Sequence, residues 1–259
     1  SILFPDSGNI RVLGGSALEA KDRIGYLPEE RGVYRKMKVA QFLLHMGVLK
    51  GMTRADAQRD ATHWLERMGL ADTAAKRCEE LSKGMQQKVQ YIAAVIQKPD
   101  LLILDEPFSG LDPVNMRLLK ELILEQHANG TTVLFSTHVM FQAEQLCEHI
   151  VMIHDGQKVL DDPLTAIRAR HTPRALDFEP LDGAVDVEAA LLQIPGIEQV
   201  ARNDGRWRLH FDAGVDVPAM VQAVAARVPP ARLELVRPNL EDVFIKLATA
   251  QQVQQEVVA

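Results

Sequence analysis

Two adjacent carboxylates that follow a short apolar run are the strongest chemical feature of the sequence. Leu101 to Leu104 is uniformly apolar, as expected of a parallel strand buried on both faces, and Asp105 and Glu106 come directly after it. In open α/β sheets, ligands bind beyond the carboxyl ends of the strands. Two carboxylates held there are costly unless a cation or a substrate needs them. The alternative interpretation is a strand that ends in an acidic turn.

This pattern suits phosphate chemistry at a metal ion. In nucleotide hydrolases the first acid of such a pair holds Mg²⁺, usually through water, and the cation neutralises charge on the phosphates. The second acid can orient or deprotonate the attacking water. On this interpretation Asp105 is the metal ligand and Glu106 is the catalytic residue.

A histidine is expected at the same edge of the sheet. Ser136-Thr137-His138 follows the next apolar stretch, Thr131 to Phe135, which we predict to be another buried strand. The imidazole of His138 can reach a terminal phosphate and stabilise charge as the bond breaks. A single histidine at the start of a helix is more often structural, but its position relative to the acid pair favours catalysis.

A helix N-terminus upstream offers backbone N–H groups to an anion. Ser82 is the predicted N-cap of a helix over 82–97, and Lys83 and Gly84 follow it. A serine cap and a glycine let the backbone approach a phosphate, and the helix dipole adds attraction. Taken in isolation, these residues are better explained by an ordinary capped helix.

The elements that must position these residues alternate between strand and helix, which predicts an α/β fold with a parallel sheet. We expect strands at 9–13, 24–27, 101–104 and 131–135, helices at 37–49, 53–68, 82–97, 113–127 and 138–147, and a hairpin of 149–154 with 158–160 through Asp155-Gly156.

The pattern changes after Pro163. Strands at 174–178, 197–201, 207–211 and 232–236 and helices at 185–192 and 215–228 give the order β-α-β-β-α-β of a small α+β ferredoxin-like unit, and a final helix follows at 240–248. We therefore place one domain at 1–162, with a helical subdomain at about 37–80, and a second at 173–259.

Composition excludes several other classes of protein. The net charge is −6, which argues against nonspecific binding to nucleic acid. Cys78 and Cys147 are the only cysteines and fit a reducing cytosol, and the eight histidines show no metal-ligand spacing. No apolar run approaches the roughly 20 residues needed to span a bilayer, and Ser1 begins no signal peptide.

Together these segments resemble the ATP-binding cassette (ABC) ATPases. LLILDEP (101–107) resembles the Walker B strand with its catalytic Glu, SGLDP (109–113) the D-loop, and STH (136–138) the switch histidine. LSKGMQQK (81–88) resembles the signature motif, whose commonest form is LSGGQ; here Lys83 replaces the first Gly and Met85 precedes Gln86. IGYLPE (24–29) is similar to the Q-loop region, with Glu29 where most members have Gln.

The resemblance implies ATP and Mg²⁺ as cofactors and a P-loop NTPase-like core. Two cassettes, as a homodimer or with a second ABC subunit, would sandwich two ATP molecules. Asp105, Glu106 and His138 of one subunit would face Ser82, Lys83 and Gly84 of the other, with Met85 and Gln86 as further nucleotide-binding candidates. Lys83 either adds positive charge near the γ-phosphate or is solvated. Asp112 would link the two sites.

The resemblance also implies a transport role. The LSKGMQQK variant, GYLPEERG (25–32) and PNLEDVF (238–244) are similar to the exporter branch of bacterial ABC ATPases. The helical subdomain and the Glu29 loop would then pass motion to an integral membrane permease, which would hold the protein at the cytoplasmic face of the membrane. Nucleic acid is not an expected partner.

One required element is absent from the sequence. The family's P-loop, G-x-x-G-x-G-K-[ST], does not occur, and Gly14-Gly15-Ser16 is no substitute because no Lys follows at the right spacing. In the family this loop lies a short helix before a segment like Leu3 to Gly8. We expect it upstream of Ser1, so that the core is incomplete at its N-terminus and this chain is inactive alone.

Two other functions compete with a transport ATPase. A soluble ABC ATPase of translation usually carries two cassettes, and one of DNA repair has a long coiled coil, for which the 53 positions from Glu29 to Ser82 leave no room. A non-hydrolysing regulatory ABC protein would lack the P-loop Lys. The intact Asp105, Glu106 and His138 argue against it.

Overall fold

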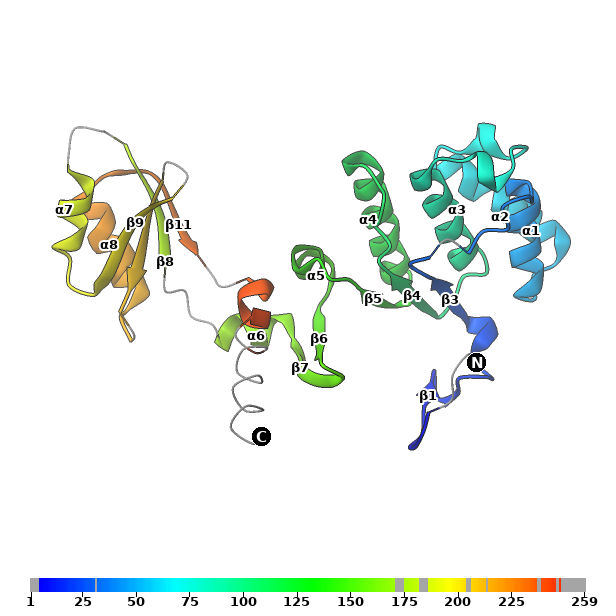
Figure 1. Cartoon of the computed structure of the whole chain (residues 1–259), viewed down its shortest axis with the longest axis horizontal. Coiled ribbons are helices and arrows are strands. Elements are labelled where there is room, and N and C mark those ends of the chain that lie inside the picture. Colours follow the sequence, from blue (N-terminus) through cyan, green and yellow to red (C-terminus); the bar gives the residue numbers. More distant parts are fainter. Residues whose placement is uncertain are drawn as a thin grey trace. The chain divides into compact units, whose positions relative to one another are not determined.

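The chain divides into two compact units, Ser1–Val139 and Met140–Ala259 (Figure 1). The computed structural model describes residues 5–30, 32–170, 175–181, 186–203, 206–212, 214–236, 239–245 and 247. This division by compactness does not test the domain limits expected from the sequence, 1–162 and 173–259, which stay a prediction.

A three-stranded parallel sheet forms the centre of the first unit, as predicted. Its strands, in the order β3-β4-β5, are Ile24–Leu27, Leu101–Asp105 and Thr132–Ser136. The register places Leu27 beside Leu104 and Leu104 beside Phe135, and Asp105 beside Ser136. The three strands therefore end level with one another, at one edge of the sheet.

Only one face of this sheet is covered within the described residues. Helices α3 (Lys83–Val95) and α4 (Pro113–Ala128) lie on the same side of the strands (Figure 1), and Leu102 and Leu104 on that side are 0% exposed. On the other face Tyr26 is 53% and Leu134 is 58% exposed. Side chains alternate between the two faces, so the prediction of a buried strand at 131–135 is wrong for the part of the chain described. In 101–104, Leu101 and Ile103 on the second face are half-buried.

The helical insert contains the two helices expected there, α1 (Val39–Leu49) and α2 (Arg54–Arg67), followed by short 3₁₀ turns at Ala71–Thr73 (η2) and Cys78–Glu80 (η3). Thr53 is the N-cap of α2: its hydroxyl oxygen accepts from the N–H of Asp56 at 3.1 Å. Gly51 has a φ of +86°, which lets the chain turn between the helices.

An ion pair between α2 and α4 connects the helical insert to the rest of the first unit. The guanidinium of Arg67, at the end of α2, donates two hydrogen bonds to the carboxylate of Glu125 on α4, at 3.0 and 2.5 Å. The same guanidinium lies 5.1 Å from the centroid of the Trp64 ring, and Trp64 packs edge-on against the buried Tyr91 of α3. Helices α2, α3 and α4 thus share one set of contacts.

The remaining elements outside the C-terminal sheet are short. They are β1 (Arg11–Val12), β2 (Gly15–Ser16), η1 (Lys21–Arg23), α5 (Met140–Leu146), β6 (His149–His154), β7 (Gln157–Pro163) and α6 (Leu164–Arg170). The strand predicted at 9–13 is limited to two residues. The hairpin β6–β7 is confirmed: Asp155 and Gly156 have φ values of 47° and 73°, the positive values that a tight two-residue turn requires.

The C-terminal sheet has ferredoxin-like topology, as predicted. Its elements are β8 (Ala175–Pro180), α7 (Val187–Leu192), β9 (Ile197–Asn203), β10 (Arg206–Phe211), α8 (Val217–Arg227) and β11 (Pro230–Val236). The strands lie antiparallel in the order β11-β8-β10-β9. Of the elements predicted in this region, Arg174, Val185, Lys246 and Ala248 lie outside the described residues.

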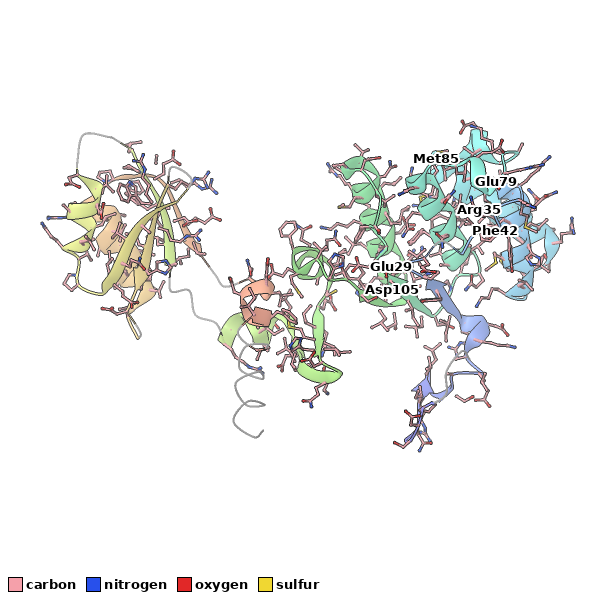
Figure 2. All side chains as sticks on the ribbon, in the orientation of Figure 1. Glu29, Arg35, Phe42, Glu79, Met85 and Asp105 are labelled. Atoms are coloured by element: carbon pink, nitrogen blue, oxygen red, sulfur yellow. The ribbon has the colours of Figure 1, made fainter. Side chains whose placement is uncertain are left out.

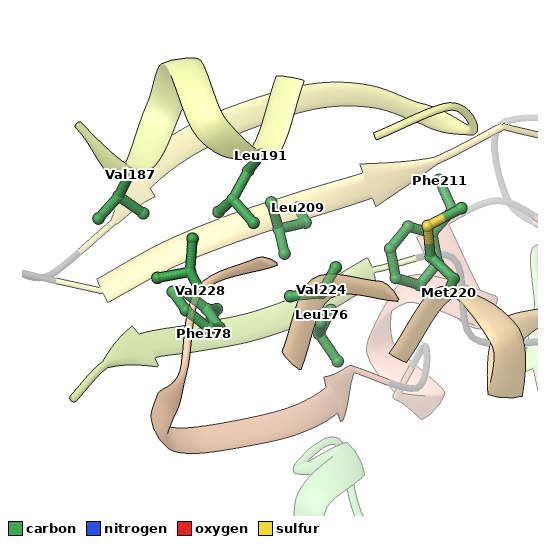
Figure 3. Packing of buried hydrophobic residues seen from close by; sticks show 9 residues of the cluster. All are labelled: Leu176, Phe178, Val187, Leu191, Leu209, Phe211, Met220, Val224 and Val228. Carbon is green, nitrogen blue, oxygen red and sulfur yellow. The ribbon is translucent and has the colours of Figure 1, made fainter. Parts of the chain in front are cut away.

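One face of this sheet forms the core with the two helices (Figure 3). The sheet contributes Leu176, Phe178, Leu209 and Phe211, and the helical side contributes Val187, Leu191, Met220, Val224 and Val228. Asp177 and Arg208 lie on the opposite face, directly across from each other on β8 and β10. The guanidinium of Arg208 donates to both oxygens of Asp177, at 2.7 and 2.8 Å.

The Asp177–Arg208 pair predicts a pH dependence of stability. The hydrogen bonds from Arg208 are the main cause that lowers the pKa of Asp177 below its ordinary 3.8. The pair therefore contributes stability that is fully present above about pH 4 and is lost as the pH falls through the lower folded pKa. We expect Asp177→Asn to flatten the fall in unfolding free energy below about pH 4.

This expectation is measured by urea unfolding, followed by Trp207 fluorescence in a Trp64→Phe background. The exposed residue Asp212, changed to Asn, is the matched control and should keep the wild-type pH dependence. An unchanged slope in Asp177→Asn would show that the ion pair does not stabilise the folded unit.

Candidate functional site

The residues selected from the sequence meet at the carboxyl edge of the parallel sheet. Glu29 lies two residues beyond Leu27, and Glu106 lies two residues beyond the level partner Leu104. His138 lies two residues beyond Ser136, the partner of Asp105. Figure 2 labels Glu29 and Asp105, which follow the paired residues Leu27 and Leu104. The register therefore places Asp105, Glu106, His138 and Glu29 at the same edge of the sheet, and the contacts join Glu106 to His138.

Glu106 has an unusual backbone conformation. Its φ is 44°, in the left-handed region, which costs a residue other than glycine roughly 1–2 kcal/mol. Hydrogen bonds on both sides hold this turn: the Glu106 N–H donates to the carbonyl of Ser136 at 3.0 Å, and its carbonyl accepts from the N–H of Ser109 at 3.1 Å. A conformation fixed in this way aims the carboxylate along the edge of the sheet.

Three polar groups contact the carboxylate of Glu106. Its Oε1 accepts from the backbone N–H of His138 at 2.7 Å and lies 2.6 Å from the ring Nδ1 of His138, and its Oε2 accepts from the hydroxyl of Thr137 at 3.2 Å. The Glu106 side chain is 15% exposed, whereas that of His138 is 84% exposed. When Nδ1 donates to the carboxylate, the Nε2 of the same ring is free to meet a ligand from solvent.

Asp105 and Ser136 supply oxygen atoms beside this pair. The Ser136 hydroxyl donates to Oδ1 of Asp105 at 2.6 Å. Mg²⁺ usually takes one or two carboxylates and completes its shell with water and substrate phosphates. Within the described residues no group of three or more His, Cys, Asp and Glu could hold a metal ion. Asp105 and Ser136 thus place oxygen atoms, the kind of ligand that Mg²⁺ prefers, next to Glu106 in the chain and at the end of its neighbouring strand.

The N-terminus of α3 has the cap expected from the sequence. The Ser82 hydroxyl oxygen accepts from the N–H of Met85 at 3.3 Å, and Ser82 and Lys83 are exposed. A Cβ added to Gly84 would lie 3.4 Å from the carbonyl oxygen of Gly110, so this N-terminus sits against the 109–113 loop. A small residue at position 84 permits that approach.

Comparisons with known proteins identify the chain. A family model described as ABC transporter matches residues 2–109, and one described as ATP-binding protein DrrA1-3-like, C-terminal domain, matches residues 163–248. An uncharacterized ABC transporter ATP-binding protein of Alkalihalophilus pseudofirmus is 42% identical over 228 residues, which cover 88% of this chain and 84% of that protein. The chain belongs to the ABC transporter ATP-binding proteins.

Two further similarities support the family and the fold. The Nod factor export ATP-binding protein I of Paraburkholderia xenovorans is 32% identical over 259 residues, with 95% of this chain and 80% of that protein covered. A solved structure of an ATP-binding subunit of an ABC transporter has a TM-score of 0.61 at 30% identity and covers 65% of this chain and 72% of its own. The predicted ABC ATPase fold is thereby confirmed. In the described part of this ABC protein, no helix has the length and apolar character that a bilayer span requires.

Sequence reasoning missed one residue that supports the site of this ABC protein. Gln87 is 2% exposed, and its side-chain amide donates to the carbonyl of Pro107 at 3.0 Å. It thus ties α3 to the residue that follows Glu106. The available signal was a polar residue on the buried face of an amphipathic helix.

Two residues predicted for the nucleotide site, Gln86 and Asp112, form hydrogen bonds with the backbone of their own chain. The amide of Gln86 donates to the carbonyls of Cys78 and Leu81, at 2.9 and 3.1 Å, and so holds the segment before α3. Asp112 is the N-cap of α4, and its pKa is lowered chiefly by the backbone N–H of Asn115. The nucleotide-binding role of Gln86 and the interface role of Asp112 stay predictions.

Proposed function

We propose that this ABC protein is the ATP-hydrolysing subunit of an exporter and that Glu106 and His138 are its catalytic residues. The contact of 2.6 Å between Oε1 of Glu106 and Nδ1 of His138, beside Asp105 at the carboxyl edge of the sheet, is the observation that supports this most directly. A general base must be oriented by a neighbour, and the three polar groups that contact Glu106 do so.

Each residue has a separate task in the proposed reaction. Glu106 orients the attacking water and accepts its proton, and we assign the proton to Oε2 because Oε1 is shared by two donors from His138. The exposed Nε2 of His138 stabilises charge on the terminal phosphate. Asp105, with Glu29, would hold Mg²⁺, which neutralises phosphate charge when bound.

The second half of each site would come from another subunit. The exposed N-terminus of α3, with Ser82, Lys83 and Gly84, presents backbone N–H groups and a positive side chain to an anion. In the proposed dimer, most simply a homodimer, this terminus of one subunit would cover the ATP bound at the sheet edge of the other.

The proposal also includes the direction of transport, which is export, and a partner in the membrane. A relative that is 32% identical over nearly the whole chain carries export in its name, and the C-terminal part matches the DrrA1-3-like domain. We infer a separate integral membrane permease that contacts the helical insert, about 37–80, and the Glu29 loop. The protein would then work at the cytoplasmic face of the membrane.

Calorimetry tests how well residues 1–259, which contain no P-loop, bind ATP. The 259 residues contain no P-loop, and each charge-assisted hydrogen bond to phosphate is worth about 1.5–3 kcal/mol. We expect residues 1–259 to bind Mg-ATP at least about a hundredfold more weakly than a version to which a P-loop segment is added before Ser1, and that version should hydrolyse ATP. Micromolar binding by residues 1–259 would contradict this expectation.

A further inference from the structure

Helix α3 packs closely against the first strand of the parallel sheet. A Cβ added to Gly25 of β3 would lie 2.1 Å from the carbonyl oxygen of Ala94, so only a glycine lets the strand approach the helix this closely. Gln90 precedes Ala94 by one turn of α3, and Gln87 precedes Gln90 by another. The two glutamines therefore lie on the side of α3 that faces β3 and the loops at the carboxyl edge of the sheet.

Each of these buried glutamines contacts a different loop. The Nε2 of Gln90 donates to the carbonyl of Glu30 at 3.3 Å. The Nε2 of Gln87 donates, as described above, to the carbonyl of Pro107. Each accepting residue directly follows one acid of the candidate site. One face of a single helix thus holds the backbone beside two acids that come from different strands.

The loop after β3 depends on Gln90 for its position. Glu29 and Glu30 are exposed, and within the part of the chain that the structure describes the bond from Gln90 is the only hydrogen bond at these two residues. Gly32, two residues further along, lies near the same amide, since a Cβ added there would be 3.9 Å from the Nε2 of Gln90. Without this donor the backbone of the loop would be held by neither side chains nor backbone.

The amide of Gln90 is not explained by stability. Gln90 is 5% exposed, and among the described residues its Oε1 has no hydrogen-bond partner. A buried acceptor without a partner costs more than one neutral hydrogen bond returns. A methionine has a similar size and avoids this cost, so packing alone does not require an amide at this position. What the amide provides is the bond to the loop.

We propose that Gln90 is a positioning residue for Glu29. With Gln87, it holds the loop after β3 and the turn after β4 on one rigid helix face, and so fixes the separation between Glu29 and Asp105. Mg²⁺ requires near-ideal octahedral geometry, so two side chains that hold one ion must keep a fixed separation. The kinetic part of this inference rests on the proposed function, in which these two acids hold Mg²⁺, whereas the structural part does not.

Gln90→Met in residues 1–259 tests the structural part without nucleotide. The substitution removes both the donor to Glu30 and the buried Oε1. We expect the urea midpoint to stay the same or to rise. At the same time, the ¹⁵N order parameters of the Glu29 and Glu30 amides should fall from about 0.85 to below about 0.6.

Gln126→Met is the matched control for this measurement. Gln126 is another buried glutamine, 9% exposed, and it lies at the C-terminal end of α4, where its carbonyl accepts from the N–H of Thr131 before β5 begins. This substitution should leave the order parameters of Glu29 and Glu30 unchanged. Order parameters that also stay near about 0.85 in Gln90→Met would show that Gln90 does not hold the loop, and would overturn the proposal.

The magnesium dependence of hydrolysis tests the kinetic part, in a version of the protein that carries a P-loop segment before Ser1. We expect Gln90→Met to raise the Mg²⁺ concentration for half-maximal hydrolysis about tenfold. At saturating Mg²⁺, kcat should change less than about twofold, and Gln126→Met should behave like the unsubstituted protein. Glu29→Ala should raise that Mg²⁺ concentration at least as much, and adding Gln90→Met to it should have no further effect.

The possible failures of this test are distinguishable. Additive effects in the double variant would show that Gln90 does not act through Glu29. Mobile amides at 29 and 30 with an unchanged Mg²⁺ dependence would show that the bond from Gln90 is only structural. Either result overturns the proposal. If Glu29→Ala alone leaves the Mg²⁺ dependence unchanged, the proposed magnesium role of Glu29 is wrong and the kinetic part is lost with it, while the order parameters still decide whether Gln90 holds the loop.

Discussion

Replacing Glu106 by glutamine, in a version of the protein that carries a P-loop segment before Ser1, is expected to slow ATP turnover about 10²–10⁴-fold and to leave ATP binding intact. Glutamine has the same shape, so it keeps the carbonyl oxygen that accepts from the N–H of His138 at Oε1. At a φ of 44°, glutamine and glutamate have the same backbone strain energy, so the substitution leaves the turn unchanged. What it loses is the ability to accept a proton from water.

Steady-state and single-turnover assays measure the rate, and calorimetry measures the affinity. Glu121→Gln is the control, because Glu121 is a 62% exposed side chain on α4 that pairs with Arg117 away from the sheet edge. Unchanged turnover in Glu106→Gln would remove Glu106 from the catalytic role. A wild type that binds ATP and does not hydrolyse it would favour the non-hydrolysing regulatory alternative.

Replacing His138 by alanine is the second large effect, a loss of about 10²–10³ in kcat. The change removes the Nδ1 that lies 2.6 Å from Oε1 of Glu106 and the exposed Nε2 assigned to the terminal phosphate. Because the two side chains act as a unit, the losses should not add. The Glu106→Gln/His138→Ala double variant should be only slightly slower than Glu106→Gln.

Single-turnover rates of the two single variants and the double variant complete this cycle. His63→Ala, on the exposed face of α2, is a histidine control that should retain wild-type turnover. Fully additive losses would mean that Glu106 and His138 act independently, and the contact seen between them would then have no role in the chemical step.

Much of the fold follows from local signals in the sequence. The Thr53 cap, the Asp155-Gly156 turn and the apolar run before Asp105 each determine an element from a few neighbouring residues. The meeting of Asp105 and His138 was also predictable, because parallel neighbours in a sheet end at the same edge. No such rule assigns the residues their roles.

What could not be predicted depends on contacts between distant residues. An apolar run does not show whether both faces of its strand are covered, and Leu134 is exposed for that reason. Nor does local sequence reveal that Leu240 packs beside β6 or that Gln87 donates to Pro107. The positive φ of Glu106 follows from the hydrogen bonds to Ser136 and Ser109, which form only in the folded unit.

The bidentate link between Arg67 and Glu125 has a mechanical consequence. Its two hydrogen bonds join the far end of α2 to α4, whose first turn is capped by Asp112. If the helical insert rotates and these two hydrogen bonds remain, α4 must move with α2. Asp112, which caps the N-terminus of α4, then moves as well. A rotation of the insert would thus move the 109–113 loop through α2 and α4, without any change in the β-sheet.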